Sequence, residues 1–282
     1  MSEHAPHAVA GAAVQVMGIV NVTPDSFSDG GRYLDHEAAI GHGRRLLADG
    51  ADILDVGGES TRPGAERVSP EVERERIIPV IAALAESGAV VSIDTMNAST
   101  ALAAIGAGAR IVNDVSGGLA DPEMLPAVAG TDAEIALGHW RGPSVDMYAH
   151  AQYEDIIAEV VAELTQRMRD AAAAGIPEER MIVDPGIGFG KRGGQNWDVL
   201  RRLPDLSRLG PRLLVGTSRK RFLTEALADA SDADPTIERR DLATAVTSVL
   251  AAQAGVWAVR VHDVAATRDA LRVAELWTGE AR

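Results

Sequence analysis

The stretch AVVSIDTMNASTALAAIGAGARIVNDVSG, from Ala89 to Gly117, contains one complete unit of the fold. It begins with a β-branched run that predicts a buried strand, continues through an alanine-rich helical segment, and ends in a second β-branched run. Two strands joined through a helix are typical of parallel sheets, because the helix carries the chain back to the start of the next strand.

The same unit recurs along the whole chain, at about the 30-residue spacing of a β–α–β crossover. The predicted strands are VQVMGIVNV from Val14, ADILDVGG from Ala51, AVVSIDT from Ala89, RIVNDVSG from Arg110, AEIALGHW from Ala133, RMIVDPG from Arg180, PRLLVGTS from Pro211 and WAVRVHDV from Trp257. The predicted helices are His36–Asp49, Pro70–Ser87, Ala98–Ala107, Pro122–Ala129, Glu154–Ala174, Trp197–Arg208, Arg239–Ala254 and Ala265–Trp277.

Eight such units in 282 residues predict an α/β protein with a single (β/α)₈ TIM barrel. A doubly wound sheet shows the same alternation and stays open as the alternative. No linker divides the chain, so we expect a flexible tail over residues 1–13 and one barrel domain over residues 14–282. Two loops are long and polar, TPDSFSDGGRYLD after Val22 and GESTRPGAERVSP after Gly57, which is typical of lids over a ligand.

Composition excludes several classes of protein. The 41 acidic residues outnumber the 27 Lys and Arg, and the net charge of −14 argues against a nucleic-acid or anionic-membrane surface. An anionic substrate would therefore need a local basic cluster. The chain has no cysteine, which excludes disulfides, Cys-bound zinc, iron–sulfur clusters and a thiol nucleophile. The opening MSEHAPHAVAGAA lacks the apolar core of a signal peptide, so we expect a cytoplasmic protein without a membrane span.

Polar residues gather where the predicted strands end, which in a TIM barrel is the rim of the active site. The two halves of this set suit different ligands. Carboxylates and an amide suit a flat heterocycle rich in N–H donors, while cations and an amide suit an anion, with bridging Mg²⁺ if an acid lies near Asn21. The first half comprises Asp94, Asn113 and Asp184, the second Asn21, Arg260 and His262; Asp55, Asp114, His139, Ser218 and Lys220 also lie at strand ends.

Other motifs are weak. Residues 188–193 satisfy G-x-G-x-x-G, but Lys191 and Arg192 do not open a helix there, and no ribose-binding acid follows a second strand. No H-E-x-x-H or G-x-S-x-G is present. Lys220 lies between Arg219 and Arg221, a run that fits either an anion site or a solvated helix start.

Seven segments in fixed order resemble dihydropteroate synthase, and the chain as a whole is similar to the actinobacterial members of that family. They are MGIVNVTPDSFSDGG (17–31), DVGGESTRPGA (55–65), SIDT (92–95), NDVSGG (113–118), DPGIGFGK (184–191), GTSRKRF (216–222) and RVHDV (260–264). The resemblance implies a transferase of folate biosynthesis, a sulfonamide target, that condenses 6-hydroxymethyl-7,8-dihydropterin diphosphate with p-aminobenzoate to give 7,8-dihydropteroate and pyrophosphate. It further implies Mg²⁺, a homodimer, small-molecule substrates and no nucleic-acid or membrane partner.

The resemblance also implies a role for each matched residue. Asp94, Asn113, Asp184 and Lys220 would hold the pterin, with Gly216 lining its slot. Asn21, Arg260 and His262 would hold the diphosphate, with Asn21 toward Mg²⁺. The last group would surround p-aminobenzoate: Phe27, Asp29, Thr61, Arg62, Pro63, Phe189 and Ser218.

The implied reaction is dissociative. Diphosphate leaves first, and Arg260 and His262 stabilise the charge on its oxygens. Asp94 and Asp184 then stabilise the pterin methylene cation until the arylamine attacks, while the two loops exclude water.

One position departs from the family pattern. Gly138 stands where the family usually has a methionine against the pterin. We expect this to open a gap worth about 1–3 kcal/mol of ligand binding, unless a neighbour such as Leu137 fills it.

Three other readings remain. A methyltetrahydrofolate-dependent methyltransferase would share Asp94, Asn113 and Asp184 but not the ESTRPG, SRK and RVHDV segments. A phosphate-binding aldolase would use Lys220 as its Schiff-base lysine, in an apolar setting that Arg219 and Arg221 disfavour. An inactive paralogue would bind the pterin but release no pyrophosphate.

Overall fold

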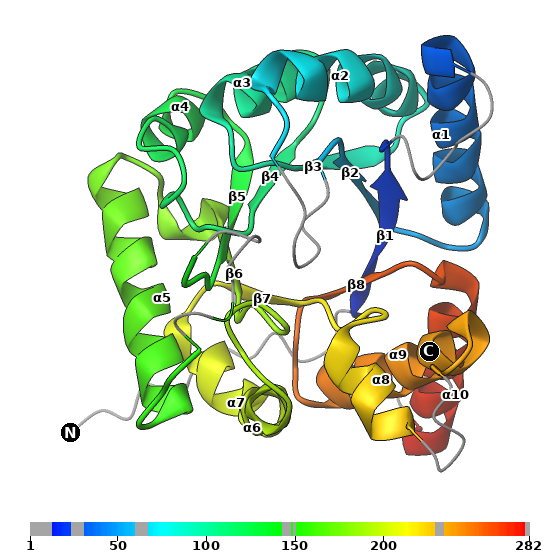
Figure 1. Cartoon of the computed structure of the whole chain (residues 1–282), viewed down its shortest axis with the longest axis vertical. Coiled ribbons are helices and arrows are strands. Elements are labelled where there is room, and N and C mark those ends of the chain that lie inside the picture. The colour runs from blue at the N-terminus through cyan, green and yellow to red at the C-terminus, as the bar shows by residue number, and fades with distance from the viewer. Residues whose placement is uncertain are drawn as a thin grey trace.

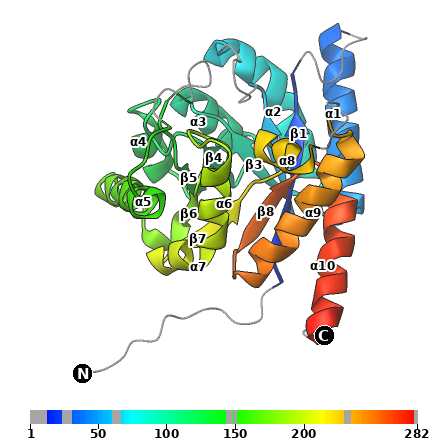
Figure 2. The same cartoon turned by 60° about the horizontal axis from the view of Figure 1, so that its bottom comes forward.

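A closed barrel of eight parallel strands forms the centre of the protein, and helices surround it (Figures 1 and 2). The computed structural model describes residues 13–23, 31–59, 67–142, 148, 151–228 and 234–279. The strands follow chain order around the barrel, and β1 pairs with both β2 and β8, which closes the sheet. This closure confirms the predicted TIM barrel and excludes the doubly wound alternative. The predicted tail falls almost entirely outside the described residues.

All eight predicted strands are present in the structure. They are β1 Gln15–Asn21, β2 Ile53–Gly57, β3 Val90–Asp94, β4 Ile111–Asp114, β5 Glu134–Gly138, β6 Met181–Asp184, β7 Arg212–Val215 and β8 Ala258–Val261. The helices are α1 Gly31–Ala48, α2 Pro70–Glu86, α3 Ala98–Gly106, α4 Met124–Ala129, α5 Ile156–Ala173, α6 Gly194–Arg201, α7 Leu203–Leu206, α8 Arg221–Leu227, α9 Ile237–Gln253 and α10 Val264–Thr278, with 3₁₀ turns η3 Glu178–Arg180 and η4 Ser207–Leu209.

The helices differ from prediction in three places. The first helix begins at Gly31, five residues before the predicted start. The predicted helix Trp197–Arg208 is divided into α6, α7 and η4, with Pro204 in the first turn of α7, where its missing N–H breaks no helical hydrogen bond. The short helix α8 was not predicted. None of the described helices has the length and apolar character needed to cross a membrane.

Alternation along the strands positions the polar residues. One apolar cluster fills the inside of the barrel and is made of Met17, Ile53, Ile111, Ala136, Ile182, Leu214 and Ala258. Because strand side chains alternate between faces, the residue two places after each of these also points inward, but nearer the carboxyl end. This relation carries Asp55, Asn113, Asp184, Gly216 and Arg260 to one mouth of the barrel.

Candidate active site

Arg260 lies at the centre of a buried ionic network that joins four strands. Its Nε is 2.5 Å from Asp55 Oδ2, and its Nη2 is 2.7 Å from Asp94 Oδ2. Asn113 Nδ2 donates to the same Asp55 oxygen over 3.0 Å. Asp55 is fully buried, so the guanidinium is the charge that makes its burial tolerable. The network fixes Asp94 and Asn113 side by side at the mouth.

Asp55 is the residue that the sequence left without a role. Its place at a strand end was visible, but its partners lie on β4 and β8, far away in the chain. Its second oxygen, Oδ1, is buried and has no hydrogen-bond partner within the described part of the chain.

Asp184 and Lys220 face each other across the next part of the mouth. Asp184 Oδ1 accepts a 2.7 Å hydrogen bond from the Gly186 amide. Burial raises the pKa of the Asp184 carboxyl, and the positive charge of Lys220 opposes that rise. Lys220 donates to the Ile187 carbonyl, and its Nζ lies 4.6 Å from the centre of the Phe189 ring. Burial also lowers the pKa of Lys220 to about 8, although Asp184 opposes this. Lys220 therefore links a pterin-side carboxylate to the aromatic ring expected beside p-aminobenzoate.

The run Arg219–Arg221 does not act as one basic cluster. Arg219 forms a two-bonded ion pair with Asp241 of α9, at 2.7 and 2.8 Å, and Arg221 pairs with Glu225 on the exposed side of α8. Arg219 also has a positive φ of 56°, a conformation that costs a non-glycine residue free energy. Of the three cations, only Lys220 turns into the mouth.

His262 and Ser218 form a pair on the side of the mouth toward β7 and β8. Ser218 Oγ lies 2.8 Å from His262 Nδ1 and accepts a 3.1 Å hydrogen bond from the His262 amide. The hydroxyl can donate to Nδ1, and in that arrangement the proton of a neutral ring lies on Nε2. An Nε2–H group is suited to a phosphate oxygen.

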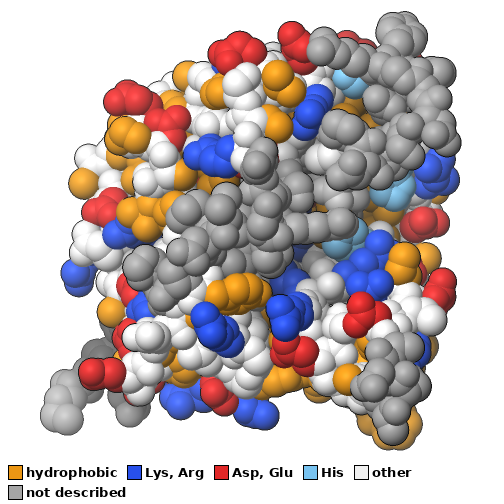
Figure 3. All heavy atoms as spheres, in the orientation of Figure 1, with side chains coloured by type: hydrophobic (Ala, Val, Ile, Leu, Met, Phe, Trp, Pro, Cys, Tyr) orange, Lys and Arg blue, Asp and Glu red, His pale blue; other side chains and the backbone are white. Residues whose placement is uncertain are grey.

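The remaining predicted residues divide into those the structure places and those it does not describe. Asn21 is half-buried at the end of β1. A Cβ on Gly216 would only touch Arg260 Cβ at 3.6 Å, so the glycine leaves open width there. Five predicted residues lie outside the described residues: Phe27, Asp29, Thr61, Arg62 and Pro63. Figure 3 shows Lys, Arg and His side chains near the middle of this view, close to β8 and α8, on a chain whose net charge is −14.

Comparison with known proteins decides the family. Residues 17–262 match the family model described as pterin binding enzyme. A dihydropteroate synthase from Mycobacterium leprae is 52% identical over 267 residues, which is 94% of this chain and 94% of the relative. The chain belongs to the dihydropteroate synthase family. It is accordingly a transferase.

Solved structures of dihydropteroate synthases have the same architecture. The Xanthomonas albilineans enzyme with 4-aminobenzoic acid has a TM-score of 0.86 and 44% identity, covering 94% of this chain and 93% of that one. The enzyme from the same organism in complex with 7,8-dihydropteroate has a TM-score of 0.83 and 42% identity, covering 94% of each chain.

Gly138, the departure from the usual dihydropteroate synthase sequence, does not leave a gap. An ideal Cβ at this position would lie 2.3 Å from the carbonyl oxygen of Val115, so backbone from the β4–α4 loop occupies the space. Leu137 does not fill it either, because it belongs to the core between barrel and helices. The expected gap at this position was therefore wrong, and the loss of ligand binding derived from it has no structural basis at the Cβ position.

The pH dependence of pterin binding in this dihydropteroate synthase barrel should reflect Asp94. Burial raises the pKa of its carboxyl; Arg260 opposes this and the nearby Asp55 adds to it. Only the carboxylate form accepts two N–H groups, so binding should weaken, as pH falls, at a higher pH than for an ordinary aspartate. The Kd for 6-hydroxymethyl-7,8-dihydropterin, measured by fluorescence titration at a series of pH values from about 5 to 9, would show this rise in Kd at low pH, called here the acid limb. In the Asp94→Asn variant the limb should vanish, and an unchanged limb would assign it elsewhere.

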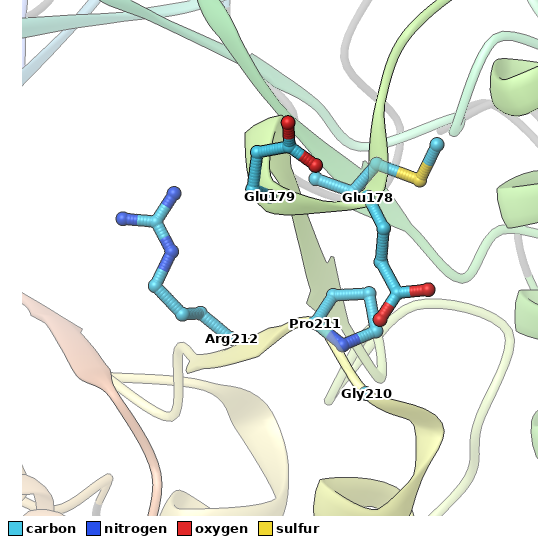
Figure 4. A pocket seen from close by; sticks show the side chains of 6 residues that line it. Glu178, Glu179, Gly210, Pro211 and Arg212 are labelled. Atoms are coloured by element: carbon cyan, nitrogen blue, oxygen red, sulfur yellow. The ribbon is translucent and has the colours of Figure 1, made fainter. Parts of the chain in front are cut away.

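A hollow of about 400 Å³ lies at the end of the barrel where the strands begin. Figure 4 shows the side chains that line it. Its lining comes from η3 and from the beginnings of β6 and β7: Glu178, Glu179, Met181, Gly210, Pro211 and Arg212. In TIM barrels this end serves stability, and none of the six lining residues is a predicted site residue.

Proposed function

We propose that this chain condenses 6-hydroxymethyl-7,8-dihydropterin diphosphate with p-aminobenzoate, giving 7,8-dihydropteroate and pyrophosphate. One observation carries the proposal: six polar side chains surround a single mouth of the barrel. Two carboxylates and an amide lie there together with three donors that are cationic or can be protonated: Asp94, Asp184, Asn113, Arg260, His262 and Lys220. This arrangement suits a substrate with an N–H-rich ring at one end and an anion at the other. The relatives and solved structures named above support the same reaction.

The ring would be held by the carboxyl groups at the ends of β3 and β6. Asp94 and Asp184 are two such acceptors, and Asn113 adds an amide that can both donate and accept. Asp55 is saturated by Arg260 and Asn113 on one oxygen, so its role is to hold these two in place. We assign Lys220 to the boundary between ring and arylamine, because it contacts Phe189 and faces Asp184.

The bond between the pterin methylene carbon and the diphosphate oxygen would break first, and the electron pair would leave with pyrophosphate. We assign the departing oxygens to the His262 ring and to the N–H groups of Arg260 that make no hydrogen bond to Asp55 or Asp94. The cation left on the pterin lies against the carboxylates of Asp94 and Asp184. Attack by the amine nitrogen of p-aminobenzoate then forms the new C–N bond, and the amine loses a proton.

Mg²⁺ fits this site as a substrate-bridging ion. The described residues contain no group of three His, Asp or Glu side chains that would form a complete metal site. Mg²⁺ commonly takes one or two protein oxygens and fills its other positions with phosphate oxygens and water. Asn21, at the end of β1, offers such an oxygen. When bound, the ion would neutralise charge on the diphosphate.

A homodimer would cover an apolar face on the outside of α9 and α10, which lie side by side (Figure 2). Leu242, Val246 and Leu250 recur every fourth residue of α9, so they share one helix face. On α10, Trp277 is 88% exposed, and Val273 and Leu276 are exposed beside it. Exposed apolar residues on two neighbouring helices are typical of a subunit interface, and a second copy of this chain would cover both faces by two-fold symmetry.

The double variant Val246→Asp/Leu250→Asp should be monomeric, because burying two carboxylates at an apolar interface is strongly unfavourable. Light scattering after size-exclusion chromatography measures the mass directly. Leu102→Asp, at an exposed position on α3, is the matched control and should stay dimeric. A wild-type protein that is monomeric at working concentrations would refute the dimer.

Pyrophosphate release tests the proposed reaction. It should require the pterin diphosphate, p-aminobenzoate and Mg²⁺ together, and 7,8-dihydropteroate should appear in equal amount. Tight pterin binding without release would instead identify an inactive pterin-binding paralogue.

A further inference from the structure

The β6–α6 loop contains a buried lysine that takes no part in the chemistry described above. Lys191 is 1% exposed, and its neighbour His139 is equally buried at the end of β5. Burial lowers the pKa of Lys191 to about 7, while the charge of Asp184 opposes this. Burying an ammonium group costs more free energy than burying an apolar side chain of similar size, unless hydrogen-bond partners compensate it. The contacts of Lys191 therefore indicate its role.

The ammonium group has one acceptor for each of its three N–H donors. Lys191 Nζ lies 2.9 Å from His139 Nδ1, 3.0 Å from the Gly186 carbonyl oxygen and 3.1 Å from the Phe189 carbonyl oxygen. The two carbonyls stand at the start and end of a tight turn, which the Phe189 amide closes by donating to Gly186 over 2.9 Å. Lys191 thus holds both ends of the turn that carries Phe189.

His139 anchors the lysine to the neighbouring helix. Since Nδ1 accepts from the ammonium, the ring proton lies on Nε2, which is 3.0 Å from Glu163 Oε2 of α5 without linear hydrogen-bond geometry. Burial lowers the pKa of His139 to about 4, so the ring is neutral. Burial would raise the pKa of Glu163, but contacts with His139 and Arg141 outweigh it and lower that pKa to about 2. A firmly ionised carboxylate therefore keeps His139 oriented toward Lys191.

The turn needs such external support. Gly186, Gly188 and Gly190 all have positive φ, between 59° and 81°, and glycine by itself selects no single conformation. Other contacts hold the remaining polar groups: Asn196 Oδ1 accepts from the Gly188 amide at 2.6 Å, and Lys220 binds the Ile187 carbonyl. The turn is therefore held by two lysines: Lys191 binds the carbonyls of Gly186 and Phe189, and Lys220 binds the carbonyl of Ile187.

We propose that Lys191, seated on His139, is a positioning residue for the arylamine substrate. It fixes the turn from Gly186 to Phe189, and with it the ring that lies beside Lys220. The inference rests on the proposed function, because it names the part of the structure that sets the arylamine position. Asp94 and Asn113, on β3 and β4, do not contact this turn, whereas Asp184 does through the Gly186 amide, so any loss of pterin affinity should be smaller than the loss for p-aminobenzoate.

The test is a comparison of KM and kcat for Lys191→Met. We expect the KM for p-aminobenzoate to rise about tenfold, equivalent to about 1.4 kcal/mol, while kcat at saturation and the Kd for the pterin change less than about threefold. Arg201→Met removes an exposed cation from α6 and should change none of these values.

A second pair of variants separates positioning from general damage. His139→Gln keeps an oxygen acceptor for the ammonium and should retain most of the wild-type KM, whereas His139→Leu removes the acceptor and should raise it. If Lys191→Met is insoluble, the difference in KM for p-aminobenzoate between His139→Gln and His139→Leu tests the inference instead.

The inference would be overturned if Lys191→Met left the KM for p-aminobenzoate unchanged, or if pterin affinity and kcat fell as much as p-aminobenzoate binding. Either result is compatible with an active wild type and so leaves the proposed function standing. A wild type that releases no pyrophosphate would overturn the proposed function instead.

Discussion

Replacing Arg260 by Met should unfold the protein more readily and abolish pterin binding. The guanidinium is the partner of Asp55, which is fully buried, and of Asp94, whose side chain is 11% exposed. Its removal leaves two uncompensated carboxyl groups, and breaking one side of a buried ion pair costs about 3–5 kcal/mol. Urea denaturation would measure the loss as a lower midpoint with an unchanged slope.

The matched control is Arg208→Met, which removes an exposed partner of Asp205. Exposed ion pairs contribute about 0–1 kcal/mol, so its midpoint should barely move. A double variant, Arg260→Met/Asp55→Asn, should recover part of the stability because it removes the orphaned charge. If Arg260→Met were as stable as Arg208→Met, the network would not have the energetic role described.

Lys220→Ala should lower kcat/KM by about 100-fold or more, with losses in the binding of both substrates. The side chain holds the Ile187 carbonyl, lies over the Phe189 ring and faces Asp184, so its removal affects both halves of the mouth. Separate titrations with the pterin and with p-aminobenzoate, together with pyrophosphate release, would measure each part.

The variant to compare with Lys220→Ala is His262→Ala. His262 contacts Ser218, and we propose that it binds the diphosphate, so its loss should lower kcat with little effect on p-aminobenzoate binding. Indistinguishable profiles for the two variants would contradict the division of the mouth into ring, arylamine and anion parts.

The strands and the polar mouth could be predicted because both depend on local sequence. β-branched runs specify buried strands, and the two-residue period then decides which side chains point inward, so Asp94, Asn113 and Asp184 could be placed in advance. Helix ends were less certain. Pro204 interrupts a pattern that otherwise continues, and α8 is only seven residues long.

Partners that are distant in the chain could not be predicted. Arg219 and Lys220 are adjacent and chemically alike, yet Arg219 turns to Asp241 because α9 packs there. Asp55 and Arg260 are 205 residues apart, and only barrel closure brings them together. Lys191 was visible in the G-x-G-x-x-G match, but its burial on His139 depends on how the loops after β5 and β6 pack.

The close packing of Gly138 against Val115 has an evolutionary consequence. A side chain at position 138, such as the methionine that the resemblance places there, requires the β4–α4 loop to move away from the site of its Cβ. Gly117, in the same loop, is equally restricted, since its Cβ would lie 2.7 Å from the Gly138 carbonyl oxygen. We therefore expect the two segments to be epistatic: a change in one should be tolerated only on a background that carries a matching change in the other.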